Sequence, residues 1–177
     1  MAIPQKHLDA ADSDNLAQVE IGNTVWLPRM YPMEQWVVGA VVINERGEAF
    51  LQRRSLDRKL FPGCWDIIGG HVEPEESILQ ALAREMTEET GWTLRAIHAT
   101  LGPYSWTTDG QNCFEVDFVV SIEGDLDQPT IETAKNSEFR WISRNDIETL
   151  SENRVPGDNL TLQVVTAAFI YTESTLT

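Results

Sequence analysis

One acidic segment, residues 70–92, constrains this chain more than any other feature of its sequence. The segment is GHVEPEESILQALAREMTEETGW. It contains a glycine, a lone glutamate and an Arg-Glu-x-x-Glu-Glu-x-Gly cluster at fixed spacings: Gly70, Glu76, Arg84, Glu85, Glu88, Glu89 and Gly91. Any fold of this chain must therefore accommodate several negative charges close together.

The glutamate cluster predicts a metal site. If residues 77–90 form one helix, Glu85, Glu88 and Glu89 stand at i, i+3 and i+4, so their carboxylates converge on one face. Like charges at this spacing repel each other, and the last turn of a helix also disfavours negative charge. A divalent cation relieves both effects, and all-oxygen ligation suits Mg²⁺ or Mn²⁺. A solvated acidic face would contain the same glutamates, but the glycine and glutamate at fixed distances upstream favour a metal site.

Local signals support the helix itself. Ser77 is a candidate N-cap, and acidic residues precede it where the positive end of a helix favours them. Gly91 follows the last periodic residue, where a left-handed conformation often ends a helix. An apolar stripe on one side predicts the face that packs on a core, formed by Ile78, Leu79, Leu82 and Met86.

The segment resembles the signature box of the Nudix hydrolases: Gly, five residues, Glu, seven residues, Arg-Glu, two residues, Glu-Glu, one residue and Gly. Met86 and Trp92 occupy the apolar positions of that box, although Trp92 is bulkier than the usual aliphatic residue. The resemblance implies an α/β/α sandwich around a mixed sheet. It also implies metal-dependent hydrolysis of a nucleoside diphosphate linked to another group.

The resemblance also assigns roles to residues of the box. Glu85, Glu88 and Glu89 would be catalytic metal ligands, with the Gly70 carbonyl as a further ligand. Glu76 and Arg84 would hold loop and helix together, and Gly91 would complete the box. The general base varies between subfamilies, and two other glutamates, Glu115 and Glu138, are candidates for contacting metal or water.

Residues that could bind the substrate lie near the box. In relatives that cleave nucleoside triphosphates, the second arginine of a pair at a strand end touches a phosphate, which here is Arg54 rather than Arg53. Arg58 and His71 are weaker candidates, because surface Arg is usually solvated and His71 could simply bond its own loop. Tryptophans offer base-stacking surfaces, although a core position is the default for each; the candidates are Trp26, Trp36 and Trp106.

The rest of the chain indicates one domain of α/β or α+β class, residues 19–177, after a polar and flexible segment, residues 1–18. The run WVVGAVVI, the turn NERGE and the run AFLQRR predict a hairpin over residues 36–54. Further strands are expected at 19–28, 94–104, 113–122 and from 138, with a short helix before 150 and a C-terminal helix over 159–171.

Composition limits the partners and the compartment. With 28 acidic and 13 basic residues the net charge is −15, which disfavours binding to nucleic acid or to an anionic membrane. No apolar run is long enough for a transmembrane helix, and no signal peptide is evident. Cys64 and Cys113 form no disulfide framework or metal motif, so we expect a cytoplasmic protein with reduced thiols. Family members are often homodimers, but nothing in the sequence marks an interface.

The leading hypothesis is a Mg²⁺-dependent pyrophosphohydrolase, with a nucleoside triphosphate, oxidised or not, as the favoured substrate. Pro103 and Tyr104 lie too close to the box to match the positions typical of ADP-ribose or dinucleoside polyphosphate hydrolases, yet an ADP-ribose or nucleotide-sugar pyrophosphatase stays open. Two other classes remain. One is a non-catalytic nucleotide-sensing module, and the other is an isopentenyl-diphosphate isomerase, whose catalytic cysteine would fall at Gly69.

Overall fold

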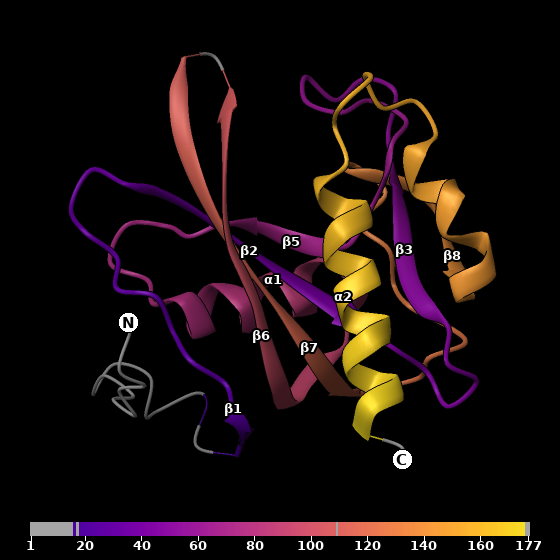
Figure 1. Cartoon of the computed structure of the whole chain (residues 1–177), viewed down its shortest axis with the longest axis horizontal. Coiled ribbons are helices and arrows are strands. Elements are labelled where there is room, and N and C mark those ends of the chain that lie inside the picture. Colours follow the sequence, from indigo (N-terminus) through magenta and orange to yellow (C-terminus); the bar gives the residue numbers. More distant parts are fainter. Residues whose placement is uncertain (1–15, 17, 109, 176–177) are drawn as a thin grey trace.

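A computed structural model gives the architecture, and it describes residue 16 and residues 18–108 and 110–175 (Figure 1). Most of the predicted flexible segment, residues 1–18, lies outside the described residues. The elements in chain order are β1 (Glu20–Thr24), β2 (Gln35–Val42), β3 (Ala49–Arg54), β4 (Trp65–Asp66), β5 (Ile68–His71), α1 (Ile78–Thr90), β6 (Thr93–Thr108), β7 (Gln111–Glu123), β8 (Asn136–Ile142), the 3₁₀ helix η2 (Arg144–Ser151) and α2 (Leu160–Thr175).

A mixed five-stranded sheet forms the centre of the fold, in the order β1-β6-β7-β2-β5. β2 lies between β7, which is parallel to it, and β5, which is antiparallel. Because β2 is covered on both faces, its sequence is an almost continuous apolar run. β5 brings Gly69 and Gly70 beside Gly39 and Val38 of β2.

The predicted hairpin over residues 36–54 is wrong. Within the described residues 35–54, one isolated bridge, between Ile43 just after β2 and Ala49 of β3, is the only ladder pairing, and β3 instead joins a second, three-stranded sheet in the order β4-β3-β8. The turn between the two strands exists, but most of β2 and the first four residues of β3 are buried on both faces. Each therefore finds long-range partners that bury it more completely than a two-stranded ribbon would.

Helix α1 confirms the predicted helix and its boundaries. The Ser77 side chain accepts a hydrogen bond from the Gln80 amide, and the Gln80 side chain bonds back to the Ser77 amide, which forms a capping box. At the other end Gly91 has φ 72°, a left-handed conformation that glycine adopts without strain.

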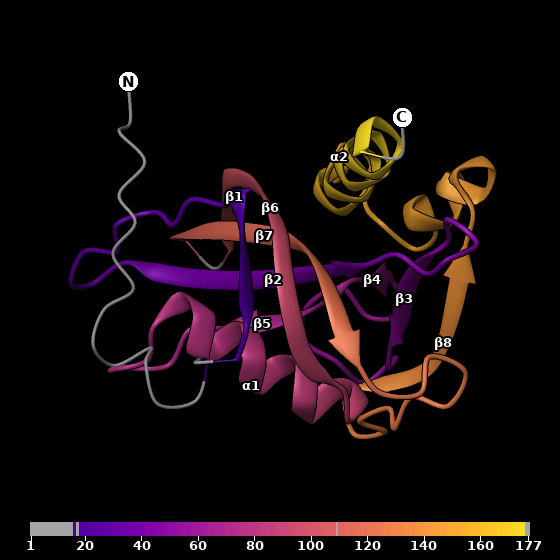
Figure 2. The same ribbon diagram turned by 90° about the horizontal axis from the view of Figure 1, so that it is seen from below.

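The two long helices cover opposite faces of the five-stranded sheet (Figure 2). One core lies on the α1 side and contains Leu79, Leu82 and Met86, while the other lies on the α2 side and contains Val164, Val165 and Phe169. This arrangement confirms the predicted mixed α/β sandwich. Cys64 and Cys113 are both buried and free.

Candidate active site

Arg84 ties the loop after β5 to helix α1. Its Nε and Nη2 donate to the two oxygens of Glu76, each at 2.9 Å, and Nη2 also donates to the His71 carbonyl at 3.0 Å. Burial opposes the charge of Glu76, but the hydrogen bonds from Arg84 and from the Glu73 amide lower its pKa. A two-pronged pair of this kind fixes geometry as well as charge. It holds Gly70 against the next turn of the helix.

Gly70 and Glu85 approach each other closely in the site. A Cβ at residue 70 would lie 2.2 Å from Glu85 Oε1, so only glycine leaves room for this carboxylate. Arg84 Nη1 donates to Glu85 Oε1 at 2.7 Å. Among the described residues, Glu85 Oε2 is buried without a hydrogen-bond partner, and Lys135 Nζ lies 3.8 Å from it. A buried acceptor left free in this way is available to a ligand.

Glu89 lies one turn further along and is 6% exposed. Its Oε2 accepts hydrogen bonds from the Gly69 amide at 3.1 Å and from Gln52 Nε2 at 3.0 Å. Burial raises the pKa of Glu89 to about 7, although the bond from Gly69 opposes the shift. A carboxylate held in this state binds a proton or a cation readily near neutral pH.

The residues of this cluster are of the types that bind a hard divalent cation. They provide two buried carboxylates, a free Glu85 oxygen and a glycine whose missing side chain opens the space. As they stand, no three His, Cys, Asp or Glu side chains of the described residues form a ready coordination group. Arg84 and Lys135 act as counter-ions to Glu85 instead, and ligation would replace those contacts.

Glu88 does not converge with its neighbours as the spacing predicted. Its side chain is 47% exposed and pairs with Arg84 Nη1 at 3.3 Å. It lies in a shallow groove beside Glu76 rather than in the cavity that Glu85 and Glu89 line. Positions i and i+4 of the helix thus face the cavity, while position i+3 lies at its flank.

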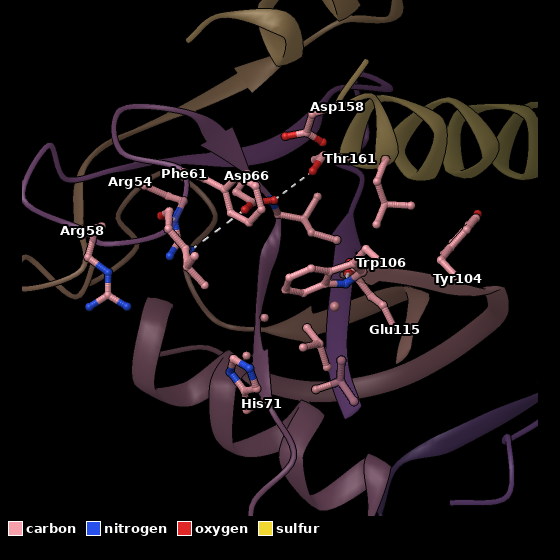
Figure 3. Close-up of a pocket in the computed structure, with 18 of the residues that line it drawn as sticks. Arg54, Arg58, Phe61, Asp66, His71, Tyr104, Trp106, Glu115, Asp158 and Thr161 are labelled. Carbon is pink, nitrogen blue, oxygen red and sulfur yellow. Dashed lines mark hydrogen bonds and ion pairs between the residues drawn. The ribbon is translucent and has the colours of Figure 1, made fainter. Parts of the chain in front are cut away.

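A cavity of about 1010 Å³ begins at these carboxylates and extends beneath α2. Figure 3 shows Arg54 and Arg58 on one side of it and Trp106, Glu115 and Tyr104 on the other, with His71 near the box. The start of α2 closes the far end, where Thr161 Oγ1 donates to Asp66 Oδ1 at 3.2 Å. The cavity thus has an acidic end, a basic flank and an aromatic end.

The alternation of β3 separates the two adjacent arginines. Arg54 lines the cavity, donating to the Leu60 carbonyl at 3.0 Å and lying 4.0 Å from Asp66 Oδ2. Arg53 points to the opposite face, where its Nη1 donates to Glu138 at 3.0 Å. Residues 53 and 138 are directly opposite in the antiparallel pair, so they share that face. The structure therefore does not bring Glu138 to the cavity.

Other predicted residues divide between cavity and core. Glu115 and Trp106 line the cavity together, and the Trp106 indole donates to Glu115 Oε2 at 2.7 Å. Trp36 is instead a core residue, stacked on Phe114 with ring centroids 5.3 Å apart. Trp26 is not among the residues that line the cavity.

Sequence reasoning missed several side chains at this site. Lys135 lies 2.9 Å from Glu132 Oε2 and bridges that residue to Glu85. Gln52 is buried and receives a hydrogen bond from Asn136 while donating to Glu89. Arg154, whose side chain is 4% exposed, donates to Asp158 and to the Trp65 carbonyl at the far end.

The missed side chains differ in how far the sequence could have indicated them. Gln52 had a signal, because it is a polar residue that follows the apolar residues of a predicted strand. Lys135 and Arg154 come from loops distant in sequence and carry no local pattern.

Within the described residues, no helix combines the length and apolarity needed to cross a membrane.

Comparisons with known proteins agree with this architecture. The family model described as NUDIX domain matches residues 33–163, well over half of the chain. A nucleoside triphosphatase NudI of Klebsiella pneumoniae (strain 342) is 29% identical over 130 residues, covering 68% of this chain and 91% of the relative. The NudI of Escherichia coli (strain K12) is 31% identical over 124 residues, covering 65% and 86%.

Solved structures share the fold. A NUDIX hydrolase from Nitrosomonas europaea has a TM-score of 0.62 and 25% identity, covering 79% of this chain and 90% of its own. A MutT protein from Methanosarcina mazei Go1 has a TM-score of 0.61 and 24% identity, covering 82% and 97%. With the intact box and the matched family model, the chain belongs to the Nudix family of pyrophosphohydrolases.

Proposed function

We propose that this protein hydrolyses a phosphoanhydride bond of a nucleoside triphosphate with the help of Mg²⁺ or Mn²⁺. The observation that carries the proposal is the continuity of the cavity. The same space contacts the buried carboxylates Glu85 and Glu89, the basic side chains Arg54 and Arg58, and the aromatic ring of Trp106. A nucleotide has the matching order of groups, with charged phosphates at one end and an aromatic base at the other.

Glu85, Glu89 and the Gly70 carbonyl would hold the cation, with Glu88 joining from the flank of the helix. The bound cation supplies charge neutralisation on the phosphates and activation of the attacking water. Gly69 and Gln52 keep the Glu89 carboxylate in place through their hydrogen bonds. The Arg84 pair with Glu76 fixes the loop that presents residue 70.

Cations on the chain would bind the remaining phosphate charge. In the part of the chain that the structure describes, Arg58 Nε is buried without a hydrogen-bond partner, so Arg58 has a free donor at the cavity. Arg54 Nε donates to the Leu60 carbonyl, and its ion pair with Asp66 is long, at 4.0 Å. Burial disfavours the charge of Lys135, but Glu132 and Glu85 raise its pKa and keep it protonated. An arginine presents its donors to phosphate in a planar fork, which favours specific orientation of the substrate.

The names of the relatives support a triphosphate as substrate, since the Klebsiella and Escherichia proteins are both nucleoside triphosphatases. The isomerase alternative needs a reactive thiol in the cavity. Cys64 is 1% exposed, burial raises the pKa of its thiol, and it does not line the cavity. The sensing alternative loses support because all box glutamates are present.

The test is hydrolysis of a substrate panel by the purified protein with Mg²⁺, with the products separated by chromatography. The panel contains the four deoxynucleoside triphosphates, 8-oxo-dGTP, ADP-ribose, a dinucleoside tetraphosphate and a nucleotide sugar. We expect cleavage of triphosphates, lost in excess EDTA and in Glu89→Gln. Cleavage of ADP-ribose or the sugar nucleotide alone would contradict the triphosphate assignment, and no cleavage by a folded, metal-loaded protein would contradict the enzyme.

A further inference from the structure

Two carboxyl groups on β7 lie at the aromatic end of the cavity, away from the box. Glu115 and Asp117 are two residues apart on a strand, so they project from the same face. Glu115 lines the cavity, whereas Asp117 is 0% exposed. Both oxygens of Asp117 are buried without a hydrogen-bond partner among the described residues. A buried polar group without a partner is uncommon and needs an explanation.

The backbone of β2 is adapted to this pair. A Cβ at Gly39 would lie 2.1 Å from Asp117 Oδ1 and 2.6 Å from Ile67 Cδ1. Gly39 itself lines the cavity, so Asp117 lies directly behind the cavity wall. A side chain at residue 39 would push the acid away, and the glycine therefore keeps the pair in position.

The pair holds one negative charge rather than two. Burial and then the charge of Asp66 raise the pKa of Glu115 to about 7. Burial and then Glu115 raise the pKa of Asp117 well above its ordinary value. Asp117 keeps the proton because it is fully buried and because the adjacent Glu115 raises its pKa, whereas Glu115 accepts a bond from Trp106 and faces the charge of Arg154. At pH 8, above the pKa of Glu115, the cavity is thus presented with the Glu115 carboxylate, which can only accept hydrogen bonds.

Aromatic rings flank this carboxylate. The rings of Phe61 and Trp106 both line the cavity, with centroids 6.1 Å apart and planes at 66°. The bond from its indole N–H to Glu115 fixes the orientation of Trp106 (Figure 3). Glu115 lies at the edge of the Trp106 indole, because it accepts a hydrogen bond from the indole N–H. A planar ring stacked on Trp106 would therefore also have its edge next to Glu115.

We propose that Glu115 is a specificity-determining residue that accepts a hydrogen bond from a ring N–H of the substrate's base. This inference rests on the proposed nucleotide substrate. Guanine, thymine and uracil carry a ring N–H on the pairing edge. Adenine and cytosine present a ring nitrogen lone pair there, which a carboxylate repels. The enzyme therefore prefers dGTP and dTTP to dATP and dCTP.

The experiment compares kcat/KM for these four triphosphates in the wild type, in Glu115→Gln and in Glu34→Gln. A hydrogen bond to a charged group corresponds to roughly a 10- to 100-fold preference. We expect Glu115→Gln to lose most of that preference, since an amide both donates and accepts. Glu34 is the matched control: its Oε2 also accepts from an indole, that of Trp36 at 2.9 Å, but it does not line the cavity.

A second measurement needs no variant. N1-methyl-dGTP lacks the ring N–H, so wild-type kcat/KM for it should fall about 10-fold or more relative to dGTP. Equal turnover of the two, or an equal loss of kcat for all four triphosphates in Glu115→Gln, would overturn the inference; the latter would make Glu115 catalytic.

If the proposed function itself is wrong, the experiment gives a different result. If no triphosphate is hydrolysed, calorimetric binding of dGMP, dTMP, dAMP and dCMP tests recognition alone. Preference for the first two that is lost in Glu115→Gln supports the inference, and indifference among the four contradicts it.

Discussion

Replacing Glu89 by glutamine should stabilise the metal-free protein at pH 8 while abolishing its activity. Burial raises the pKa of this carboxyl from 4.5 to about 7. The folded chain therefore holds a proton that the unfolded chain releases, and stability falls as the pH rises from about 4.5 to 7. At about 1.4 kcal/mol per tenfold, ionising Glu89 in the fold costs about 3 kcal/mol.

Glutamine removes that cost because its carbonyl can still accept the bonds from Gly69 and Gln52. The amide also adds N–H donors that need acceptors, which reduces the benefit. We therefore expect the free energy of unfolding to rise by about 1–2 kcal/mol, or Tm by about 2–8 °C for a chain of this size. At pH 5 the folded wild type is already neutral at this position, so the gain should disappear and the variant should melt at or slightly below wild type.

The assay is thermal unfolding followed by circular dichroism in EDTA at pH 5 and pH 8. Glu88→Gln serves as the control, because the Glu88 side chain is 47% exposed and should leave Tm at either pH almost unchanged. Added Mg²⁺ should raise Tm of the wild type at pH 8 and leave Glu89→Gln nearly unaffected. A Glu89→Gln protein that melts below wild type at pH 8 in EDTA would refute the argument that the buried Glu89 charge destabilises the metal-free protein and that metal binding offsets this effect.

Three further substitutions test the surrounding structure. Gly70→Ala places a methyl group 2.2 Å from Glu85 Oε1 and should abolish Mg²⁺-dependent activity with little change in circular dichroism; activity within tenfold of wild type would contradict the close packing. Arg84→Lys loses the two-pronged bond to Glu76 and should cost about 1–3 kcal/mol in denaturant unfolding, whereas a neutral result would mean that the pair is dispensable. Trp92→Ala empties a site 2% exposed and should cost about 3–5 kcal/mol by the same measurement, so a loss below about 1 kcal/mol would contradict its core role.

Local sequence patterns predicted the helix of the box in detail because its determinants are local. Ser77, the apolar stripe and Gly91 each act within a turn or two, and all appear in the structure as expected. The class of fold followed from the same alternation of strand and helix signals. The link from box to family was equally direct, since its spacings are fixed by one loop and one helix.

The pairing of strands and the contacts between distant side chains were harder to predict from the sequence. The run 36–54 has the pattern of a hairpin, but which strands pair is decided by burial across the whole fold, and β3 belongs to the other sheet. Glu138 was a plausible base in sequence, yet its register opposite Arg53 turns it away from the cavity. Lys135 reaches Glu85 from a loop 50 residues away, and no local spacing could predict that contact.

The most direct test of the metal site is Mn²⁺ binding followed by electron paramagnetic resonance. Free Mn²⁺ gives a strong signal that decreases on binding, so titration of the protein measures affinity without any substrate. We predict saturable binding by the wild type at pH 8, weakened at least tenfold in Glu85→Gln and in Glu89→Gln and unchanged in Glu34→Gln. Equal binding by all four proteins would show that the carboxylates of α1 do not hold the cation, and would contradict the mechanism proposed for this site.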